Sequence, residues 1–324
     1  MIELFAALGE ELRHFGDDPE THRIVAEACR VNGWFTPDEV CRAVQTLADE
    51  MLRPEQLKQW LMPYAVPVQV PRRILVVMAG NIPAVGFFDL LCVVCSGHVC
   101  LYKPAAKDSV LMDYLVGRLQ ALAPDVPIVR YEEPMSADAI IATGSDNAER
   151  YFRASYAGRP MLLRGSRQSV AVLSGDETPE QLHGLADDIW TYSGLGCRNV
   201  SLIFVPEGYD LHLRMPDVNP KYKNNYRQRK ALLQMQRIPF CDLGAALLVE
   251  QSEFPKALSE VAVARYRSLD EVAAWLEAHD QTVQCVVTEC LPHERRAAFG
   301  RAQAPTLTDW PDGVNVLDWL TNLA

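Results

Sequence analysis

Short apolar runs alternate with apolar stripes at helical spacing from residue 73 onward. Helical patterns include an apolar helix through Cys95, a helix that Asp108 caps, and a helix that Thr143-Gly144-Ser145 opens and that ends near Tyr156. Strands alternating with helices at this spacing predict a mostly parallel sheet covered on both faces, with ligands at the carboxyl ends of the strands. The predicted strands of this sheet are 73–78, 99–102, 127–130, 138–142, 161–163 and 169–173.

The chain begins with a segment, residues 1 to about 63, whose apolar pattern is helical. Val44, Leu47, Ala48 and Met51 lie on one helical face, and Thr36-Pro37-Asp38-Glu39 has the form of a helix start with proline at the first position. We therefore predict an all-helical N-terminal segment, and none of its residues suggests catalysis.

A second series of elements follows residue 177. Thr178-Pro179-Glu180-Gln181 has the form of a capping box, and we expect its helix to stop at Gly194 or Gly196. Cys197 follows at once. The remaining expected elements are a strand over 200–205, a polar stretch over 222–229, a helix over 230–237, a strand over 245–250, a helix over 268–279, a strand over 283–287 and a final helix.

Composition and charge exclude several classes of protein. With 324 residues, 49% of them hydrophobic and 23% charged, the chain resembles an ordinary soluble globular protein. A formal net charge of −11 argues against nucleic acid or an anionic membrane as the main partner. Gly80 and Pro83 interrupt the longest apolar run, 74–102, so we expect no membrane span, and the first residues lack the basic start of a secretory signal. Nine cysteines spread through apolar segments favour a reducing cytoplasm.

Cys197 is the strongest single candidate for catalysis. A cysteine in an apolar segment is usually a small buried hydrophobic residue. Cys197 differs because two glycines, Gly194 and Gly196, precede it at a predicted helix–strand junction and Arg198 follows it. Backbone access for a ligand and a neighbouring positive charge both favour a reactive thiolate. From these residues alone, a catalytic nucleophile and a buried structural cysteine both remain open.

The pair Cys92 and Cys95, with His98 and Cys100 nearby, has spacing that suggests zinc. A structural zinc site needs about four ligands that converge from turns. These residues instead lie in an apolar passage from helix to strand, where packing in the core explains them. We therefore expect no metal site.

Three further signals follow predicted strands. Asn81 is a turn residue beside glycine and proline, or an amide donor aimed at an oxyanion. Lys103 is a solvated charge, or a ligand contact at the carboxyl end of its strand. Thr143-Gly144-Ser145 is a plain helix start, or a source of backbone N–H groups for a pyrophosphate. Each signal is weak when it is taken alone.

In this order the signals resemble the motifs of the aldehyde dehydrogenase superfamily, and more narrowly those of its acyl-CoA reductase family, typified by the fatty-acid reductase of bacterial bioluminescence. The resemblance covers nearly the whole chain from about residue 30, and the block around Cys197 is specific. The stretches that carry it are Asn32-Gly33-Trp34-Phe35-Thr36, Val77-Met78-Ala79-Gly80-Asn81-Ile82-Pro83, Tyr102-Lys103-Pro104, Ala142-Thr143-Gly144-Ser145, Gly194-Leu195-Gly196-Cys197-Arg198-Asn199-Val200-Ser201 and Asp312-Gly313-Val314.

The resemblance implies a fold and a domain division. The fold is α/β and aldehyde dehydrogenase-like, with a Rossmann-type parallel sheet for the cofactor and a smaller α/β catalytic domain. The implied division is a helical segment over 1–70, a nucleotide-binding domain over 71–177 and a catalytic domain over 178–299. Residues 300–324 form a C-terminal segment, and one version of this division returns it to the nucleotide-binding domain. Superfamily members usually pair through a sheet edge, so a homodimer or higher homo-oligomer is implied.

The resemblance also implies roles for particular residues. Cys197 matches the nucleophile that takes the acyl group, and Asn81 matches the side chain that holds the oxyanion together with the Cys197 backbone N–H. Lys103 matches the lysine that contacts the adenosine ribose. Thr143, Gly144 and Ser145 match the segment under the pyrophosphate.

Two departures from the wider superfamily refine the expected chemistry. Leu163 stands where hydrolytic aldehyde dehydrogenases have the glutamate that activates water, and a general base is typically worth ~10²–10⁴-fold. A thioester at the enzyme should therefore survive until hydride arrives. Ala106, with Lys107 beside it, stands where NAD-preferring relatives often place an acidic residue. This difference favours NADPH as the cofactor, with NADH as the alternative.

The sequence thus predicts reduction of an acyl-CoA or acyl-carrier thioester to an aldehyde through a Cys197 acyl-enzyme. One alternative is a CoA-acylating aldehyde dehydrogenase that acts on a short aldehyde. Another is a non-catalytic member of the family that binds nucleotide or a partner, against which the presence of Asn81, Lys103 and Cys197 argues. The chain is shorter than the luminescence reductases, so the resemblance does not carry over the length of the acyl chain.

Overall fold

The computed structural model describes residues 1–144 and 146–323, which form two compact units. The first unit comprises residues 1–166 and 306–324, and the second comprises 167–305. The domain limits expected from the sequence, near 70, 177 and 299, differ from these bounds, and the division of function among domains stays a prediction. Among the described residues, no helix combines the length and the apolar character that crossing a membrane requires.

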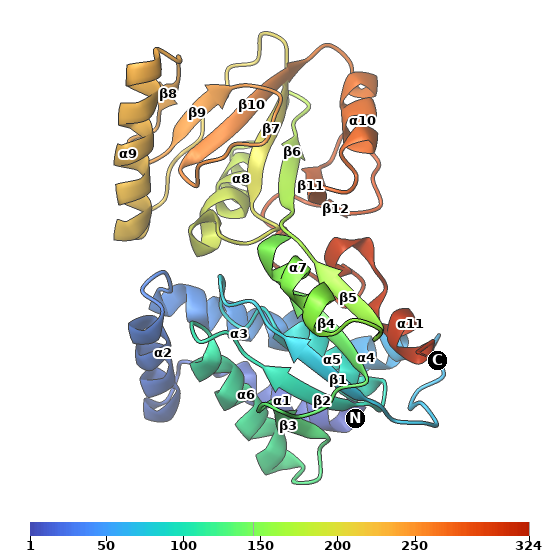
Figure 1. Ribbon diagram of the computed structural model, residues 1–324. Coiled ribbons are helices and arrows are strands. Elements are labelled where there is room, and N and C mark those ends of the chain that lie inside the picture. The colour runs from blue at the N-terminus through green and yellow to red at the C-terminus, as the bar shows by residue number, and fades with distance from the viewer. Residues whose placement is uncertain (145, 324) are drawn as a thin grey trace. The chain divides into compact units, whose positions relative to one another are not determined.

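The first unit contains a parallel sheet with helices on both faces (Figure 1). Its strands are β1 (Arg73–Val77), β2 (Val99–Lys103), β3 (Ile128–Arg130), β4 (Ala139–Thr143) and β5 (Met161–Arg164). Its helices are α1 (Ile2–Leu12), α2 (Pro19–Val31), α3 (Pro37–Met51), α4 (Pro54–Leu61), α5 (Phe87–Cys95), α6 (Ser109–Leu122), α7 (Asp146–Ser155) and α11 (Val316–Thr321), with a 3-10 turn, η2 (Pro311–Gly313).

Successive apolar side chains along β1 point to opposite faces of the sheet, which explains why both faces are covered. Ile74 and Val76 point into the large core that α1 to α6 and α11 share, and Leu75 points into a smaller core on the opposite face. Phe152 and Tyr156, from α7 and the residues after it, pack on that second core. The strand order in the described part of this unit is β3-β2-β1-β4-β5, with every pair parallel. This is the doubly wound arrangement of nucleotide-binding sheets.

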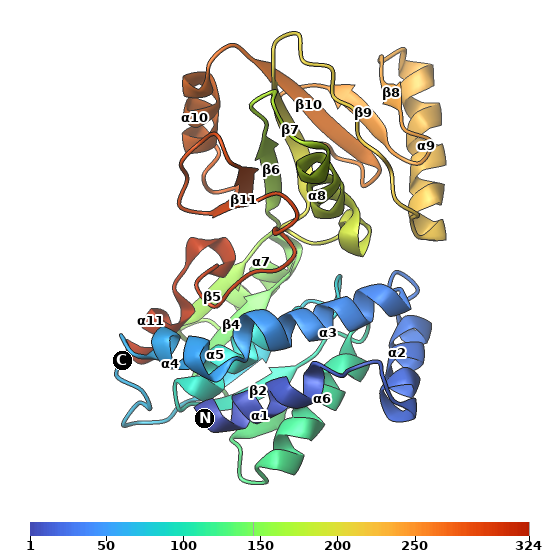
Figure 2. The ribbon, with the colours of Figure 1, turned by 180° about the vertical axis from the view of Figure 1, so that it is seen from behind.

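The second unit has its own sheet, ordered β12-β11-β6-β7-β10-β9-β8 within the described residues. Only the short edge pair, β8 with β9, is antiparallel there. Figure 2 shows α8 in front of β7, which it contacts, and α9 beside the edge formed by β8 and β9. Its strands are β6 (Gln168–Val172), β7 (Val200–Pro206), β8 (Cys241–Asp242), β9 (Leu247–Glu250), β10 (Glu260–Tyr266), β11 (Val283–Thr288) and β12 (Arg296–Ala297). Its helices are α8 (Pro179–Trp190), α9 (Pro220–Gln236) and α10 (Leu269–Ala278), with a 3-10 turn, η1 (Thr191–Gly194).

Several elements differ from those predicted by the sequence. The strand expected over 169–173 forms as β6, but it pairs with β7 and β11 in the second sheet, so its assignment to the first sheet is wrong. The polar stretch expected over 222–229 is helical, because Asn219 caps α9 and Pro220 starts it. The interior strand β10, which lies between β7 and β9, was not predicted. The helix after Thr178 ends at Trp190 rather than at Gly194 or Gly196.

A buried ion pair joins α5 to β5 in the first unit. The Arg164 Nη1 lies 2.5 Å from the Asp89 Oδ2, and the two side chains are 5% and 8% exposed. Within residues 1–144 and 146–323, Nε and Nη2 of Arg164 and Oδ1 of Asp89 have no hydrogen-bond partner. Removing one member of such a pair leaves an uncompensated charge in the interior, whereas removing both does not.

We predict that Arg164→Met lowers the free energy of unfolding by ~3–5 kcal/mol. The double variant Arg164→Met, Asp89→Leu should recover most of this loss, because neither charge is then left alone. Urea unfolding followed by circular dichroism measures both values. Equal losses in the single and double variants would contradict this account of the pair.

Candidate active site

The carboxyl edge of the first sheet brings several predicted site residues together. Lys103 ends β2, Thr143 ends β4, and Leu163 lies one residue before the end of β5. Val77, the last residue of β1, pairs with Lys103 on one side and with Ala142 on the other. The strand order reverses direction between β1 and β4, and ligands of such sheets bind at this point. Parallel topology therefore places these residues at one edge of the sheet.

The loop after β1 carries Asn81 and packs tightly against the loop after β2. A Cβ atom added to Gly80 would lie 2.7 Å from the Cβ of Ala105, so only glycine allows this approach. The Asn32 side-chain amide donates to the Gly80 carbonyl at 3.2 Å, which attaches the loop to the end of α2. Asn81 itself is exposed. Its side chain thus extends from a backbone that both neighbours hold in place.

Asp108 fixes the other end of this loop, which is a role the sequence did not predict. Asp108 stands at the N-cap position of α6, as predicted, but its side chain makes no capping hydrogen bond there. Its Oδ1 instead accepts the Ala84 N–H at 3.2 Å, where Ala84 adopts a positive φ of 54°. Burial raises the pKa of Asp108 to about 8. The group is therefore a mainly neutral acid at pH 7.

The predicted cofactor residues lie at the same edge. Lys103 Nζ lies 3.4 Å from Glu133 Oε1, with its side chain 45% exposed, and Lys107 is exposed. The Gly144 N–H donates to the Arg164 carbonyl at 3.1 Å, so the sheet already satisfies this donor. Ser145, the third residue of the predicted pyrophosphate segment, lies outside the described residues. The cofactor-binding roles stay predictions.

Cys197 lies in the second unit, exposed, on a turn just before β7. The side chain of Asn199 organises this turn. Its Oδ1 accepts the Gly196 N–H at 2.8 Å, and its Nδ2 donates to the Thr191 carbonyl at 2.9 Å and to the Asp188 carbonyl at 3.1 Å. The Ser169 hydroxyl donates to the Cys197 carbonyl at 2.9 Å. An exposed thiol on a firmly held backbone is the arrangement that a nucleophile needs.

The segment before the turn has an unusual backbone. Tyr192 and Ser193 adopt positive φ values of 56° and 55°, and Gly194 follows at 67°. Left-handed conformations at non-glycine residues are unfavourable and persist only where the surroundings impose them. The Asn199 contacts on both sides of this segment supply that constraint. The early end of α8 at Trp190 is thus a consequence of how the turn is held.

Arg198 and Asp188 attach the turn to residues near the end of the second unit. The Arg198 Nε donates to the Ala302 carbonyl at 2.6 Å, and its Nη2 lies 3.6 Å from the Cys285 sulfur. Asp188 is fully buried and accepts the N–H groups of Gly300 and Ala302 at 2.7 and 2.9 Å. Burial raises the pKa of Asp188 to about 7. Arg198, which the sequence offered as a positive charge beside the Cys197 thiol, thus also holds the loop in place through these contacts.

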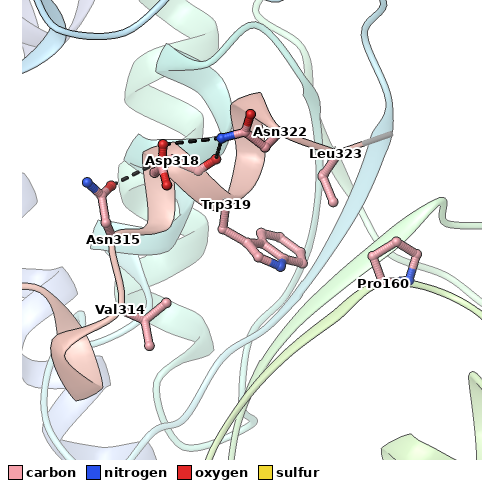
Figure 3. Close-up of a pocket in the computed structure, with 7 residues that line it drawn as sticks. All are labelled: Pro160, Val314, Asn315, Asp318, Trp319, Asn322 and Leu323. Atoms are coloured by element: carbon pink, nitrogen blue, oxygen red, sulfur yellow. Dashed lines mark hydrogen bonds between the residues drawn. The ribbon is translucent and has the colours of Figure 1, made fainter.

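The cysteine pair of α5 and a pocket beside α11 do not involve the predicted site residues. Cys92 and Cys95 are buried in α5, and burial raises the pKa of both thiols, to about 12 for Cys95. A pocket of about 520 Å³ lies beside α11. Its lining, drawn in Figure 3, includes none of the predicted site residues. Its lining residues are Pro160, Val314, Asn315, Asp318, Trp319, Asn322 and Leu323.

Sequence reasoning missed the residues that support the site. Asn199 stands inside the motif block around Cys197, so its position was noted but its role was not. Asp108 and Asp188 had no functional signal, because a carboxylate at the start of a helix or inside one normally lies in solvent. Their burial depends on distant loops, the one carrying Ala84 and the one carrying Gly300.

Comparison with known proteins identifies the fold. The profile of the acyl-CoA reductase (LuxC) family matches residues 20–214, which is more than half of the chain. In a comparison with curated protein sequences, none matches this chain. An acetylating aldehyde dehydrogenase from Geobacillus thermoglucosidasius is 12% identical with a TM-score of 0.63, over 93% of this chain and 82% of that one.

Two other solved structures are similar to a comparable degree. An oxidoreductase from Marinobacter aquaeolei is 13% identical with a TM-score of 0.64, over 94% of this chain and 78% of that one. The other is the NADP-dependent glyceraldehyde-3-phosphate dehydrogenase from Bacillus halodurans C-125, complexed with NADP. It is 12% identical with a TM-score of 0.60, over 89% of this chain and 72% of that one. At these identities the likeness shows the fold alone, and it confirms the predicted aldehyde dehydrogenase-like α/β fold.

We predict that Asp108→Asn changes how stability depends on pH. A carboxyl with a raised pKa contributes its full stability below the pKa of an unfolded Asp, about 3.9, and this contribution is lost as the pH rises through about 8. The amide keeps an acceptor for the Ala84 N–H and does not ionise. The free energy of unfolding of the variant, relative to wild type, should therefore rise by more than ~1 kcal/mol between about pH 5 and about pH 9. Urea titrations across this range measure the difference, and a difference independent of pH would be contrary to expectation.

Proposed function

Because the chain belongs to the acyl-CoA reductase (LuxC) family, we propose that it reduces an acyl thioester to an aldehyde with NADPH, through an acyl-enzyme at Cys197. The family makes the chain an oxidoreductase that acts on aldehyde or acyl groups. The observation that carries the finer proposal is the exposed Cys197 thiol on a turn held by Asn199. The donor is an acyl-CoA or an acyl-carrier thioester.

In the first step, the Cys197 thiolate attacks the carbonyl carbon of the thioester. A bond forms between sulfur and carbon, and the carbonyl oxygen becomes an oxyanion that accepts hydrogen bonds from the Asn81 amide and the Cys197 N–H. Collapse of this intermediate expels the CoA or carrier thiolate, which takes up a proton, and leaves the acyl group on Cys197. Oxyanion donors of this kind are typically worth ~10²–10³-fold in rate.

The residues at the carboxyl edge of the first sheet suit a nicotinamide dinucleotide. The reversal of strand order between β1 and β4 is where such sheets bind dinucleotides, and the ammonium groups of Lys103 and Lys107 suit ribose and phosphate oxygens. When bound, the reduced nicotinamide supplies the hydride that takes the acyl group to the aldehyde level. The thiohemiacetal at Cys197 then gives up its proton and breaks its carbon–sulfur bond, which releases the aldehyde and regenerates the thiolate.

Leu163 offers no base that could activate water for hydrolysis of the acyl-enzyme. It stands on β5 next to Ala142 in the sheet register, and its side chain packs against the apolar core on the α7 face. An aliphatic side chain at this position accepts no proton from water. Thioester reduction requires that the acyl group remain on Cys197 until hydride transfer, and the absence of a base here supports that order of events.

We predict that Cys197→Ser abolishes covalent acylation when the enzyme is mixed with radiolabelled acyl-CoA or acyl-carrier donors of several chain lengths. Asn81→Ala should keep the site of labelling and slow it by ~10²–10³-fold. Mass spectrometry of the intact protein and of its peptides measures the extent and position of labelling.

A matched control for this experiment is Cys241→Ser, because Cys241 is also exposed. That variant should label as wild type does. Wild-type enzyme that binds nucleotide but never acylates would favour a non-catalytic role. Faster turnover of a short aldehyde with CoA and NADP⁺ than of the thioester with NADPH would favour the oxidative, CoA-acylating direction.

The cofactor preference depends on the residues that follow β2. Ala106 and Lys107 are both exposed, and neither carries the carboxylate that would repel a 2′-phosphate. We predict that Ala106→Glu lowers the ratio of kcat/KM with NADPH to kcat/KM with NADH by at least about tenfold. Ala106→Gln is the matched control, because a glutamine side chain has nearly the same size as glutamate and carries no charge. This variant should leave the ratio close to that of wild type. Initial rates with each cofactor test this, and an unchanged ratio in both variants would remove the argument for NADPH.

A homodimer or higher homo-oligomer, a cytoplasmic location and the absence of a metal site stay predictions. None of them enters the chemistry above.

A further inference from the structure

Charge is distributed very unevenly along this acidic chain. Residues 218–241 contain six Lys or Arg and no Asp or Glu, so the rest of the chain, whose total formal charge is −11, carries −17. Five of the six basic residues lie in α9, which forms one edge layer of the second unit (Figure 1). A compact basic element on an acidic protein indicates a local partner of negative charge.

The packing of α9 leaves its basic side accessible. Tyr222, Tyr226 and Leu233 form its inner stripe, and the last two pack with Leu247 and Val249 of β9. Lys223 and Arg227 stand four residues apart, so they share one side of the helix, and both are exposed.

Acidic residues of the second unit neutralise only part of this charge. The Arg229 guanidinium pairs with the buried Glu260 carboxylate, and Lys230 Nζ lies 2.6 Å from Asp242 Oδ2. Arg227 donates to the Asn224 side chain, which is neutral. Those two ion pairs hold α9 to the sheet edge, whereas the charges of Lys223 and Arg227 are directed to solvent.

The basic end of α9 is joined to the segment that leads to Cys197. The Trp190 Nε1 donates to the Tyr222 hydroxyl at 3.1 Å, and both side chains are buried. Trp190 is the last residue of α8, and η1 and the Cys197 turn follow it directly. Lys221 and Lys223 flank Tyr222, so they stand at the end of α9 that contacts the end of α8. A partner bound here would lie beside the element that delivers the nucleophile.

We propose that the outer face of α9, marked by Lys223 and Arg227, docks an acidic acyl-carrier protein that presents its thioester to Cys197. This inference rests on the proposed function and assigns the acyl donor that the chemistry alone leaves open. An acyl-carrier protein holds its thioester at the end of a flexible prosthetic arm, so the carrier itself need not touch Cys197. Complementary charge at such a surface raises the rate of association and selects the partner.

Charge and shape favour a protein over a membrane or a nucleic acid. A helix that binds a lipid surface inserts an apolar face, but the apolar stripe of α9 is already packed on the sheet, and Leu232 and Met235 are its exposed large apolar residues within the described chain. A long nucleic acid would extend over the rest of the protein, whose net charge is −17. A small acidic partner needs only the local patch.

The test compares two donors that carry the same acyl chain, one as a CoA thioester and one on an acyl-carrier protein, across a series of chain lengths. We expect Arg227→Glu and Lys223→Glu each to lower kcat/KM for the carrier donor by roughly tenfold. In the same variants, kcat/KM for the acyl-CoA donor should change by less than about twofold. Added salt should weaken use of the carrier donor in wild type, because it screens exposed charges. Lys256→Glu is the matched control, since Lys256 is an exposed basic residue of the second unit outside α9.

A binding measurement separates this inference from the proposed function. Fluorescence anisotropy of a labelled carrier should report weaker binding to Arg227→Glu than to wild type or to Lys256→Glu. Carrier binding with that dependence, but without acylation of Cys197, would support the docking surface and overturn the proposed function. Two results would overturn the proposed docking surface while acyl-CoA still acylates Cys197. In the first, all variants use the carrier donor equally well. In the second, wild-type enzyme does not use the carrier donor at all. Retention of wild-type protein on anionic lipid vesicles, lost in Arg227→Glu, would overturn it in favour of a membrane.

Discussion

The parallel direction of every strand in the first sheet is the constraint on which the rest of the proposed cofactor site depends. Parallel strands end at the same edge, so the loops that follow β1, β2, β4 and β5 are neighbours although long stretches of chain separate them. Lys103, Thr143 and Leu163 reach this edge through the register of the sheet. The glycine at position 80 then lets the β1 loop lie against the β2 loop, which positions Asn81.

Buried carboxyl groups provide a second kind of order in both units. Asp108 holds Ala84 in the loop that carries Asn81, and Asp188 holds Gly300 and Ala302 beside the residues that precede Cys197. Each group accepts backbone N–H donors that would otherwise be unsatisfied in the interior. Two loops without regular secondary structure thereby acquire defined positions, and one of them is the loop that carries Asn81.

The sequence predicted those parts of the fold that depend on local pattern. The helical N-terminal segment, the strands of the first sheet and the capping box at Thr178 formed as expected. The assignment of β6 to the first sheet was wrong, because strand pairing depends on partners distant in sequence that periodicity does not reveal. The start of α9 was missed because its polar composition hid the cap formed by Asn219 and Pro220. The candidate site was predicted through motif order, whereas Asn199, Asp108 and Asp188 act through long-range contacts that only coordinates reveal.

The raised pKa values of Asp108 and Asp188, about 8 and about 7, also make protons part of the folding equilibrium. At neutral pH the folded protein holds a proton on Asp108 and part of one on Asp188, while an unfolded Asp, with a pKa of about 3.9, holds almost none. Unfolding therefore releases protons to the solvent. The heat measured for unfolding then contains the ionisation enthalpy of the buffer, so the same protein gives different calorimetric enthalpies in phosphate and in an amine buffer.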